Sequence, residues 1–337
     1  MREIKWSVEQ PFQALALTGG GFRGLFAAQA LQCMEEHIGH PVGRHFDISC
    51  GTSIGGIVAL AVAFEVPMKK VVDVFTEHGG TIFPPHTPPE GKWQVGCDLF
   101  RYRNRPRYSS SPLRQAIASL IPEDAILGDA LHPVAIPAVN VTEGRPQVFK
   151  TRHKQEWHRD WKLKAIDVAL ATSAAPTFFE LAEISGSLYS DGGLFANAPD
   201  MIAFHEAEHY FDVPVDAVRI LSIGTTTKSY SISFNAGREF GVADWMQDAR
   251  LFSVMISAQQ QFVDQLMTHR LGDRYLRLDK EPSQEQASDL GLDIATPVAI
   301  KTLKALATKA TTDLIGNRLD SYLAHAPQLK LFGKDNG

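Results

Sequence analysis

Apolar positions along the first two thirds of the chain follow two alternating patterns. Continuous apolar runs of strand length lie at residues 12–17, 46–50, 133–141, 147–151, 187–190 and 217–224. Between them, apolar residues recur every three or four positions, which is typical of helices, at residues 22–36, 54–64, 67–78, 111–121, 163–172 and 199–210. This alternation predicts an α/β fold with a mostly parallel sheet and helices on both faces.

The pattern becomes mainly helical in the last third of the chain. Helical periodicity extends over residues 242–271 and 298–324, with a short strand expected between them at 275–278. We therefore divide the chain into a core, residues 12–224, and a mainly helical C-terminal extension, residues 225–337. The extension is expected to pack on the core as part of one structural unit.

Two segments of the core depart from this alternation. Residues 79–111 are rich in proline, glycine and arginine. They predict a long loop, which in a compact domain is typical of a lid or a binding segment. Residues 48–64 carry no charge, but their serine, threonine and glycine residues indicate a buried strand, turn and helix rather than a membrane span.

The composition is that of an ordinary globular protein. Of the 337 residues, 44% are hydrophobic and 21% are charged, which excludes wholesale disorder. The net charge of −5 argues against a general nucleic-acid binder, so no DNA or RNA partner is expected. The 3 cysteines have no metal-ligand spacing and indicate a reducing compartment. Because the polar N-terminus is unlike a signal peptide, the sequence predicts a cytoplasmic protein.

The motif Gly51-Thr52-Ser53-Ile54-Gly55 lies between a predicted strand and a predicted helix. A G-x-S-x-G pattern in this context is typical of a nucleophile elbow, in which small residues permit a sharp turn. The turn would place the Ser53 hydroxyl at a helix N-terminus, whose positive end favours an alkoxide and a nearby oxyanion. The alternative is a structural role, with Ser53 capping the helix on a tight turn.

A second glycine-rich motif, Gly19-Gly20-Gly21-Phe22-Arg23-Gly24, also joins a strand to a helix. Consecutive N–H groups without Cβ atoms can converge on an oxyanion of acyl transfer or on a phosphate. The phosphate-loop pattern is absent, since Leu25 and Phe26 stand where it requires Lys and Ser or Thr. The motif also matches the dinucleotide pattern G-x-G-x-x-G, but no acidic residue ends a clear second strand about twenty residues later.

The motif Ser190-Asp191-Gly192-Gly193 places a carboxylate at the end of a short predicted strand. Asp191 is either a turn former or the general base for Ser53. A catalytic triad needs a histidine in a turn after a strand, and none of the 12 histidines has that distinctive context. A dyad of Ser53 and Asp191 is therefore the economical hypothesis.

These motifs, in this order and each at a strand end, resemble those of the patatin-like phospholipases. Residues 19–24 resemble the glycine-rich oxyanion element of that family, 51–55 its nucleophile elbow, and 191–193 its aspartate motif. The segment 171–176, Ala-Thr-Ser-Ala-Ala-Pro, resembles the stretch that precedes that aspartate. The resemblance covers about residues 12–224.

The resemblance implies a three-layer α/β/α fold and a hydrolase that cleaves acyl esters of phospholipids or lysophospholipids without a metal or other cofactor. Ser53 would be the nucleophile and Asp191 the base. The oxyanion hole would be formed by Gly19, Gly20, Gly21 and Arg23. One departure is Thr18, since many family members have Asp before the glycines. We expect activity to persist, because the backbone donors remain.

A run of basic and aromatic residues lies in the predicted loop before the helix at 111–121. It contains Arg101, Tyr102, Arg103, Arg105 and Arg107, with no acidic residue among them. Tyrosine can stack on a base and arginine can pair with phosphate, so the run is a candidate contact for lipid headgroups or for a phosphate-bearing small ligand. The alternative is a solvated basic loop.

Size and layout are also similar to those of bacterial patatin-like effectors in anti-phage signalling. That resemblance implies activation by a cyclic dinucleotide, a phospholipid substrate, and peripheral contact with the inner face of the membrane. Assembly into a homo-oligomer stays open. Two alternatives are an ungated lipid acyl hydrolase of general metabolism and a non-catalytic ligand sensor on the same fold. Retention of both Ser53 and Asp191 argues against the sensor.

Overall fold

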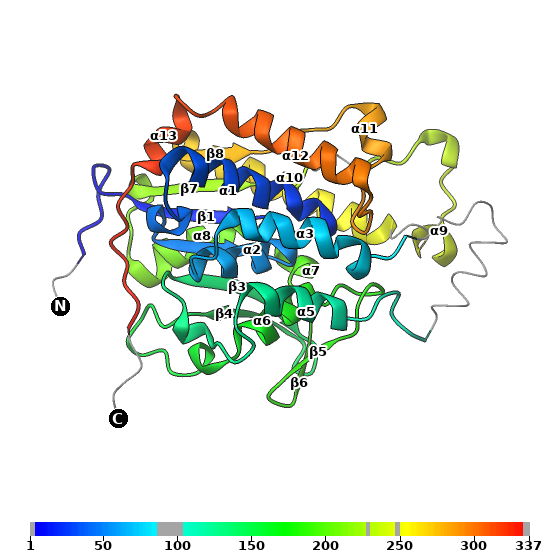
Figure 1. The fold of residues 1–337 in the computed structure, drawn as a ribbon, viewed down its shortest axis with the longest axis horizontal. Coiled ribbons are helices and arrows are strands. Elements are labelled where there is room, and N and C mark those ends of the chain that lie inside the picture. The colour runs from blue at the N-terminus through cyan, green and yellow to red at the C-terminus, as the bar shows by residue number, and fades with distance from the viewer. Residues whose placement is uncertain (1–3, 86–103, 227–229, 247–249, 333–337) are drawn as a thin grey trace.

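A computed structural model describes residues 4–85, 104–226, 230–246 and 250–332 of the chain. At the centre of this described part is an eight-stranded sheet with the order β5-β6-β3-β2-β1-β7-β8, in which β4 pairs with β3 off this path (Figure 1). The strands are β1 (Phe12–Leu17), β2 (Ile48–Gly51), β3 (Val134–Asn140), β4 (Arg145–Lys150), β5 (Ala182–Ile184), β6 (Ser187–Asp191), β7 (Val218–Ile223) and β8 (Tyr275–Leu278).

Strands β3, β2, β1, β7 and β8 run parallel to one another. Strands β4 and β6 each pair antiparallel with β3, and β5 pairs antiparallel with β6. The predicted α/β fold with a mostly parallel sheet is therefore confirmed. The short strand expected at 275–278 is β8, and its pairing with β7 means that the last third of the chain also contributes to the sheet.

Helices cover both faces of the sheet (Figure 1). All six residues of β1 are buried. Leu15 and Leu17 pack in a core with α1, α2, α3, α5, α6 and α12, whereas Ala14 and Ala16 face a second core with α8 and α10. The helices are α1 (Leu25–Ile38), α2 (Ile54–Ala63), α3 (Met68–Ile82), α5 (Ser111–Leu120), α6 (Ala165–Ser173), α7 (Gly193–Ala196), α8 (Asp200–His205), α9 (Val242–Met246), α10 (Arg250–Leu271), α11 (Gln284–Ser288), α12 (Pro297–Thr312) and α13 (Arg318–Leu323).

Several helix boundaries differ from those predicted. Helix α3 continues to Ile82, four residues beyond its predicted end, because Gly79 belongs to the helix. A Cβ at Gly79 would lie 2.4 Å from the Phe22 ring, so packing rather than a turn explains this glycine. The helix expected at 298–324 is broken into α12 and α13, and Gly316 between them has φ 79°.

Short elements are the ones that the sequence pattern misses. Strand β5 has three residues and α11 has five, so neither is long enough to show a period. The single helix expected at 199–210 is α8 followed by a π-helical turn, Glu206–Tyr210.

The ends of three strands place the glycine-rich, G-x-S-x-G and Asp-Gly-Gly motifs side by side. Strand β1 ends before Gly19, β2 leads into Ser53, and β6 ends at Asp191. Strand β3 holds two of them together, because it pairs with β2 near its start and with Asp191 opposite Ala138. None of the helices in the described ranges is long and apolar enough to cross a membrane.

Candidate active site

Ser53 lies in the sharp turn between β2 and α2 that its motif predicts. Its backbone angles, φ 55° and ψ −127°, fall in a region that residues with a side chain rarely adopt. Two hydrogen bonds hold the turn: the Ser53 N–H donates to Thr172 Oγ1 (2.9 Å), and the Thr172 hydroxyl donates to the Pro137 carbonyl (2.6 Å). Ser53 thus lies at the N-terminus of α2 and remains partly exposed.

The glycines on each side of Ser53 are required by space. A Cβ at Gly51 would lie 2.1 Å from the Gly55 carbonyl oxygen, and a Cβ at Gly55 would lie 2.3 Å from the Leu17 carbonyl oxygen. A larger residue at either position would displace backbone rather than a flexible side chain. The motif therefore brings β1, β2 and α2 into close contact and fixes Ser53 relative to the end of β1.

Asp191 is the hydrogen-bond partner of Ser53. The Ser53 hydroxyl donates to Asp191 Oδ2 (2.7 Å), and the Gly193 N–H donates to Oδ1 (2.6 Å). Asp191 is 2% exposed, and burial raises the pKa of its carboxyl to about 7, against the opposing effect of these two hydrogen bonds. A carboxylate with such a pKa can both accept and return a proton near neutral pH. The structure thus brings the two predicted catalytic residues together.

The three consecutive glycines 19–21, which we call the glycine strip, follow β1 directly. The Gly19 carbonyl accepts hydrogen bonds from Asn197 Nδ2 (3.1 Å) and from the Thr225 hydroxyl (3.3 Å). In a trans peptide, the carbonyl and the following N–H point in opposite directions. The two contacts therefore turn the Gly20 N–H away from Asn197 and Thr225.

Two N–H groups of the glycine strip are available to a ligand. The Gly19 N–H is used, since it donates to the Asn197 carbonyl (2.9 Å). The Arg23 N–H donates to the Gly20 carbonyl (3.2 Å). This contact fixes the peptide between Gly20 and Gly21 and so orients the Gly21 N–H. Within the described ranges, no atom accepts a hydrogen bond from the N–H of Gly20 or Gly21. Both glycines line the same cavity as the catalytic pair, so they are the candidate oxyanion donors, whereas Gly19 has a structural role.

The loop between α11 and α12 closes on the glycine strip. The Phe22 N–H donates to the Leu292 carbonyl (2.7 Å), and a Cβ at Gly21 would lie 2.0 Å from that oxygen. The next residue, Asp293, accepts a hydrogen bond from the Tyr108 hydroxyl (2.8 Å). This loop is thereby fixed both to the strip and to the segment that precedes α5.

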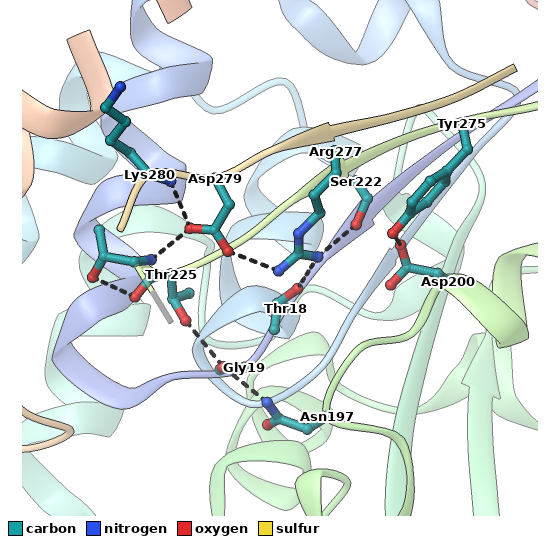
Figure 2. A network of polar contacts seen from close by, with 11 residues as sticks. Thr18, Gly19, Asn197, Asp200, Ser222, Thr225, Tyr275, Arg277, Asp279 and Lys280 are labelled. Atoms are coloured by element: carbon teal, nitrogen blue, oxygen red, sulfur yellow. Dashed lines mark hydrogen bonds and ion pairs between the residues drawn. The ribbon is translucent and has the colours of Figure 1, made fainter. Parts of the chain in front are cut away.

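A polar network lies behind the glycine strip, at the ends of β7 and β8 (Figure 2). Arg277 donates to the hydroxyls of Thr18 (3.0 Å) and Ser222 (2.8 Å) and forms an ion pair with Asp279 (2.9 Å). Asp279 also accepts the N–H of Thr226 (2.9 Å). Burial is the largest single effect on Arg277 and opposes its charge, but Asp279, Tyr275 and Asp200 together raise the pKa of the guanidinium. The network ties the residue before the strip to two other strands.

Ser53 and Asp191 open into an apolar cavity. The lining of the cavity is mostly apolar, which suits an acyl chain or another small apolar group. Besides the catalytic pair and the strip, its main lining residues are Phe22, Ile54, Ile57, Phe75, Ile82, Phe83, Leu113, Phe178, Phe179, Phe252, Ile256 and Leu292. No histidine is among the lining residues in the described part of the chain.

The predicted basic run is described only in part. Arg101, Tyr102 and Arg103 lie outside the described residues. Arg107 forms an ion pair with Asp293 (3.4 Å), and its guanidinium lies 5.7 Å from the centre of the Phe178 ring. Arg107 therefore helps to hold the loop beside the strip, while contact of the run with an anionic ligand stays a prediction. Arg105 is exposed.

Arg23 is half-buried. Burial lowers the pKa of its guanidinium, and the charge of Asp279 partly offsets this effect. In the ranges that the structure describes, its Nε atom is buried without a hydrogen-bond partner. Its backbone N–H is what contacts the glycine strip, so an oxyanion role for the guanidinium stays a prediction.

Sequence patterns did not indicate the residues that hold the strip in place, which are Asn197, Thr225, Arg277, Asp279 and Leu292. Of these five, only Asn197 lies near a motif in the sequence, because the short helix α7 that follows the aspartate motif ends just before it. Thr225 and Arg277 bond to residues 206 and 259 positions away, so local patterns cannot reveal them. Across the described residues, no group of three or more His, Cys, Asp or Glu is placed to hold a metal ion.

Comparisons with known proteins agree with the motifs. A family model described as patatin-like phospholipase matches residues 15–204. A "cGAMP-activated phospholipase" from Pseudomonas aeruginosa is 35% identical over 327 residues, which cover 95% of this chain and 94% of that protein. A protein with the same name from Vibrio cholerae is 37% identical over 324 residues, covering 89% of this chain and 90% of its own. The solved structure of VipD from Legionella pneumophila covers 89% of this chain and 67% of its own, with TM-score 0.39 and 13% identity.

Proposed function

The chain belongs to the patatin-like phospholipase family, and we propose that it hydrolyses acyl ester bonds of phospholipids through Ser53 and Asp191. The observation that carries this proposal is the 2.7 Å hydrogen bond from the Ser53 hydroxyl to the buried Asp191 carboxylate. This pair faces an apolar cavity that the N–H groups of Gly20 and Gly21 also border. The cavity would take an acyl chain and present its ester carbonyl to Ser53.

The geometry supports a two-step acyl transfer. Asp191 takes the hydroxyl proton as Ser53 Oγ attacks the ester carbonyl carbon, and the N–H groups of Gly20 and Gly21 stabilise the oxyanion. The ester C–O bond then breaks, and the departing lysophospholipid oxygen takes the proton from Asp191. In the second step, a water loses a proton to Asp191 and attacks the acyl-serine. Fatty acid leaves, and Ser53 regains its proton.

We further propose that a cyclic dinucleotide activates the enzyme. Support comes from the two bacterial relatives, which are named for activation by cGAMP and match 95% and 89% of this chain. Unregulated cleavage of phospholipids would damage the membrane of the producing cell, so dependence on a ligand fits a defence role. Such an enzyme would act from the cytoplasm on the inner face of the membrane.

The test is release of fatty acid from phosphatidylethanolamine and phosphatidylglycerol vesicles, with and without cGAMP. We expect release by the wild type only with cGAMP, and a fall of about a thousandfold or more in Ser53→Ala. Ser119→Ala is the matched control, because that hydroxyl only donates to the Ala116 carbonyl within α5. Undiminished release by Ser53→Ala would refute the assigned nucleophile. Full release without cGAMP would refute the activation but not the hydrolysis.

A further inference from the structure

Exposed large apolar side chains are concentrated in the segment before the pocket-lining part of α10. Of fifteen such side chains in the described residues, six lie between residues 230 and 251: Tyr230, Ile232, Phe234, Val242, Met246 and Leu251. We call these six the apolar segment. Phe234 is fully exposed, and Val242 is 81% exposed. Side chains of this kind are unfavourable in water and mark a surface that meets a partner.

The apolar segment is attached to the wall of the cavity. The Tyr230 N–H donates to the Ser257 hydroxyl (3.0 Å), and Ser257 follows Ile256, which lines the cavity. The Arg250 guanidinium lies 5.2 Å from the Phe240 ring centre, which connects the segment to the start of α10. In Figure 1, α9 lies at the right end of the molecule, whereas α13 lies at the left.

We propose that the apolar segment inserts into the surface of a phospholipid bilayer and so places the mouth of the cavity at the membrane. This proposal rests on the proposed phospholipase function, since it is a lipid that must pass from the bilayer into the cavity. Phe252 follows Leu251 in α10 and lines the cavity, so the segment leads directly into the helix that forms part of the cavity wall. A second copy of the chain seated on this surface would instead cover the route by which a lipid enters.

Electrostatic attraction does not account for binding of the apolar segment to a bilayer. Between residues 230 and 251 the sequence has two basic residues, Arg238 and Arg250, and three acidic ones, Glu239, Asp244 and Asp248. A net charge of −1 gives no attraction to anionic lipids, so binding must come from apolar side chains that leave water. Binding by this segment is therefore expected to change little with added salt.

The experiment measures flotation of protein with phosphatidylcholine and phosphatidylglycerol vesicles, in the presence of cGAMP and at low and high salt. All proteins carry Ser53→Ala so that the vesicles stay intact. We expect Phe234→Ser with Val242→Ser to weaken vesicle binding at least about tenfold, since each removes a large apolar group from the bilayer. The matched control is Val8→Ser with Leu131→Ser, because both side chains are 61% exposed.

The control pair lies away from the catalytic site. The Leu131 N–H donates to the carbonyl of Ala63, at the C-terminal end of α2, whereas Ser53 lies at its N-terminal end. Val8 precedes β1, and the glycine strip follows it. Neither control substitution is expected to change vesicle binding.

A second readout uses the same surface substitutions with Ser53 present. Hydrolysis of a water-soluble short-chain ester should be unchanged, while hydrolysis of vesicle lipid should fall about as far as vesicle binding falls. Vesicle binding unchanged by the double substitution would overturn the proposal. So would a dimer that the double substitution dissociates while vesicle binding persists. Flotation measures vesicle binding without turnover. It therefore tests this proposal even if the chain proves not to be a hydrolase.

Discussion

At the scale of single residues, the chemistry depends on how Asp191 holds its proton. Burial raises the pKa of its carboxyl to about 7, while the hydrogen bonds from Gly193 and Ser53 oppose the shift. The folded protein therefore binds a proton more tightly than the unfolded chain. Its stabilising contribution is present at low pH and is lost as pH rises through about 7. Above that pH the charged Asp191 carboxylate lowers the stability of the fold, but only in this form can it accept the Ser53 proton.

This pKa predicts the pH dependence of catalysis. The value of kcat/KM should rise with pH and level off above about 7, and below that it should fall about tenfold per pH unit, because Asp191 must be deprotonated to accept the Ser53 proton. The measurement uses an uncharged short-chain ester, so that no lipid group titrates. Glu206→Gln, which alters a buried carboxylate outside the cavity, should leave the position of the rise unchanged. A profile that is flat between about pH 5 and 8 would contradict a base of this pKa.

At the scale of elements, the turns at the strand ends could be predicted from the sequence. The residues from other elements that hold these turns in place could not. The glycines at 51 and 55 and the strand before them are local signals, and the structure has the sharp turn that they predict. The glycine strip likewise follows β1 as expected. Its orientation, however, depends on Asn197 and Thr225, which hold the Gly19 carbonyl from other elements. Contacts of this kind leave no periodic pattern in the sequence.

The network behind the strip makes a prediction at this scale. Arg277→Met removes the hydrogen bond to Thr18 and leaves Asp279 without its ion-pair partner. We expect kcat to fall about tenfold to a hundredfold with little change in KM, because the network positions the oxyanion donors rather than the lipid. Unfolding should also become easier, by about 2 kcal/mol, since the half-buried Asp279 carboxylate loses its ion-pair partner.

Two further variants separate positioning from folding. Arg219→Met, on neighbouring β7, removes an arginine that contacts Tyr322 and Ser321 and should leave kcat unchanged. Arg277→Met combined with Asp279→Asn should regain much of the lost stability but not the lost kcat. Recovery of kcat together with stability would show that the network has only a structural role.

At the scale of the whole molecule, the sequence predicted the class of fold. It did not predict which contacts the last third of the chain makes with the core. Alternating strands and helices over 12–224 predicted the parallel sheet with helices on both faces. Periodicity also predicted β8, but not that it would pair with β7 and carry Arg277 to the strip. The loop at Leu292 is a similar case, since its backbone carbonyl makes the contact and any residue type could supply it.

The division of the chain at residue 224 into a core and a C-terminal extension stays a prediction, because residues from both parts hold the glycine strip. The glycine strip follows β1 near the start of the chain, yet Thr225 and Leu292 bond to this region from beyond residue 224. The catalytic pair itself comes from within 12–224. Nucleophile and base thus lie in one part of the chain, and part of the support for the oxyanion donors lies in the other.

The most direct test of the central claim is labelling by a fluorophosphonate probe, which phosphonylates an activated serine and no ordinary one. With cGAMP present, mass spectrometry of the labelled protein should place one adduct on the peptide that contains Ser53. The rate of labelling should fall at least about a hundredfold in Asp191→Asn, because the base that activates the hydroxyl is lost. Asp200→Asn, a buried aspartate that accepts the Tyr275 hydroxyl instead, should label at the wild-type rate. An adduct on another residue, or an Asp191→Asn variant that labels as fast as the wild type, would contradict the account.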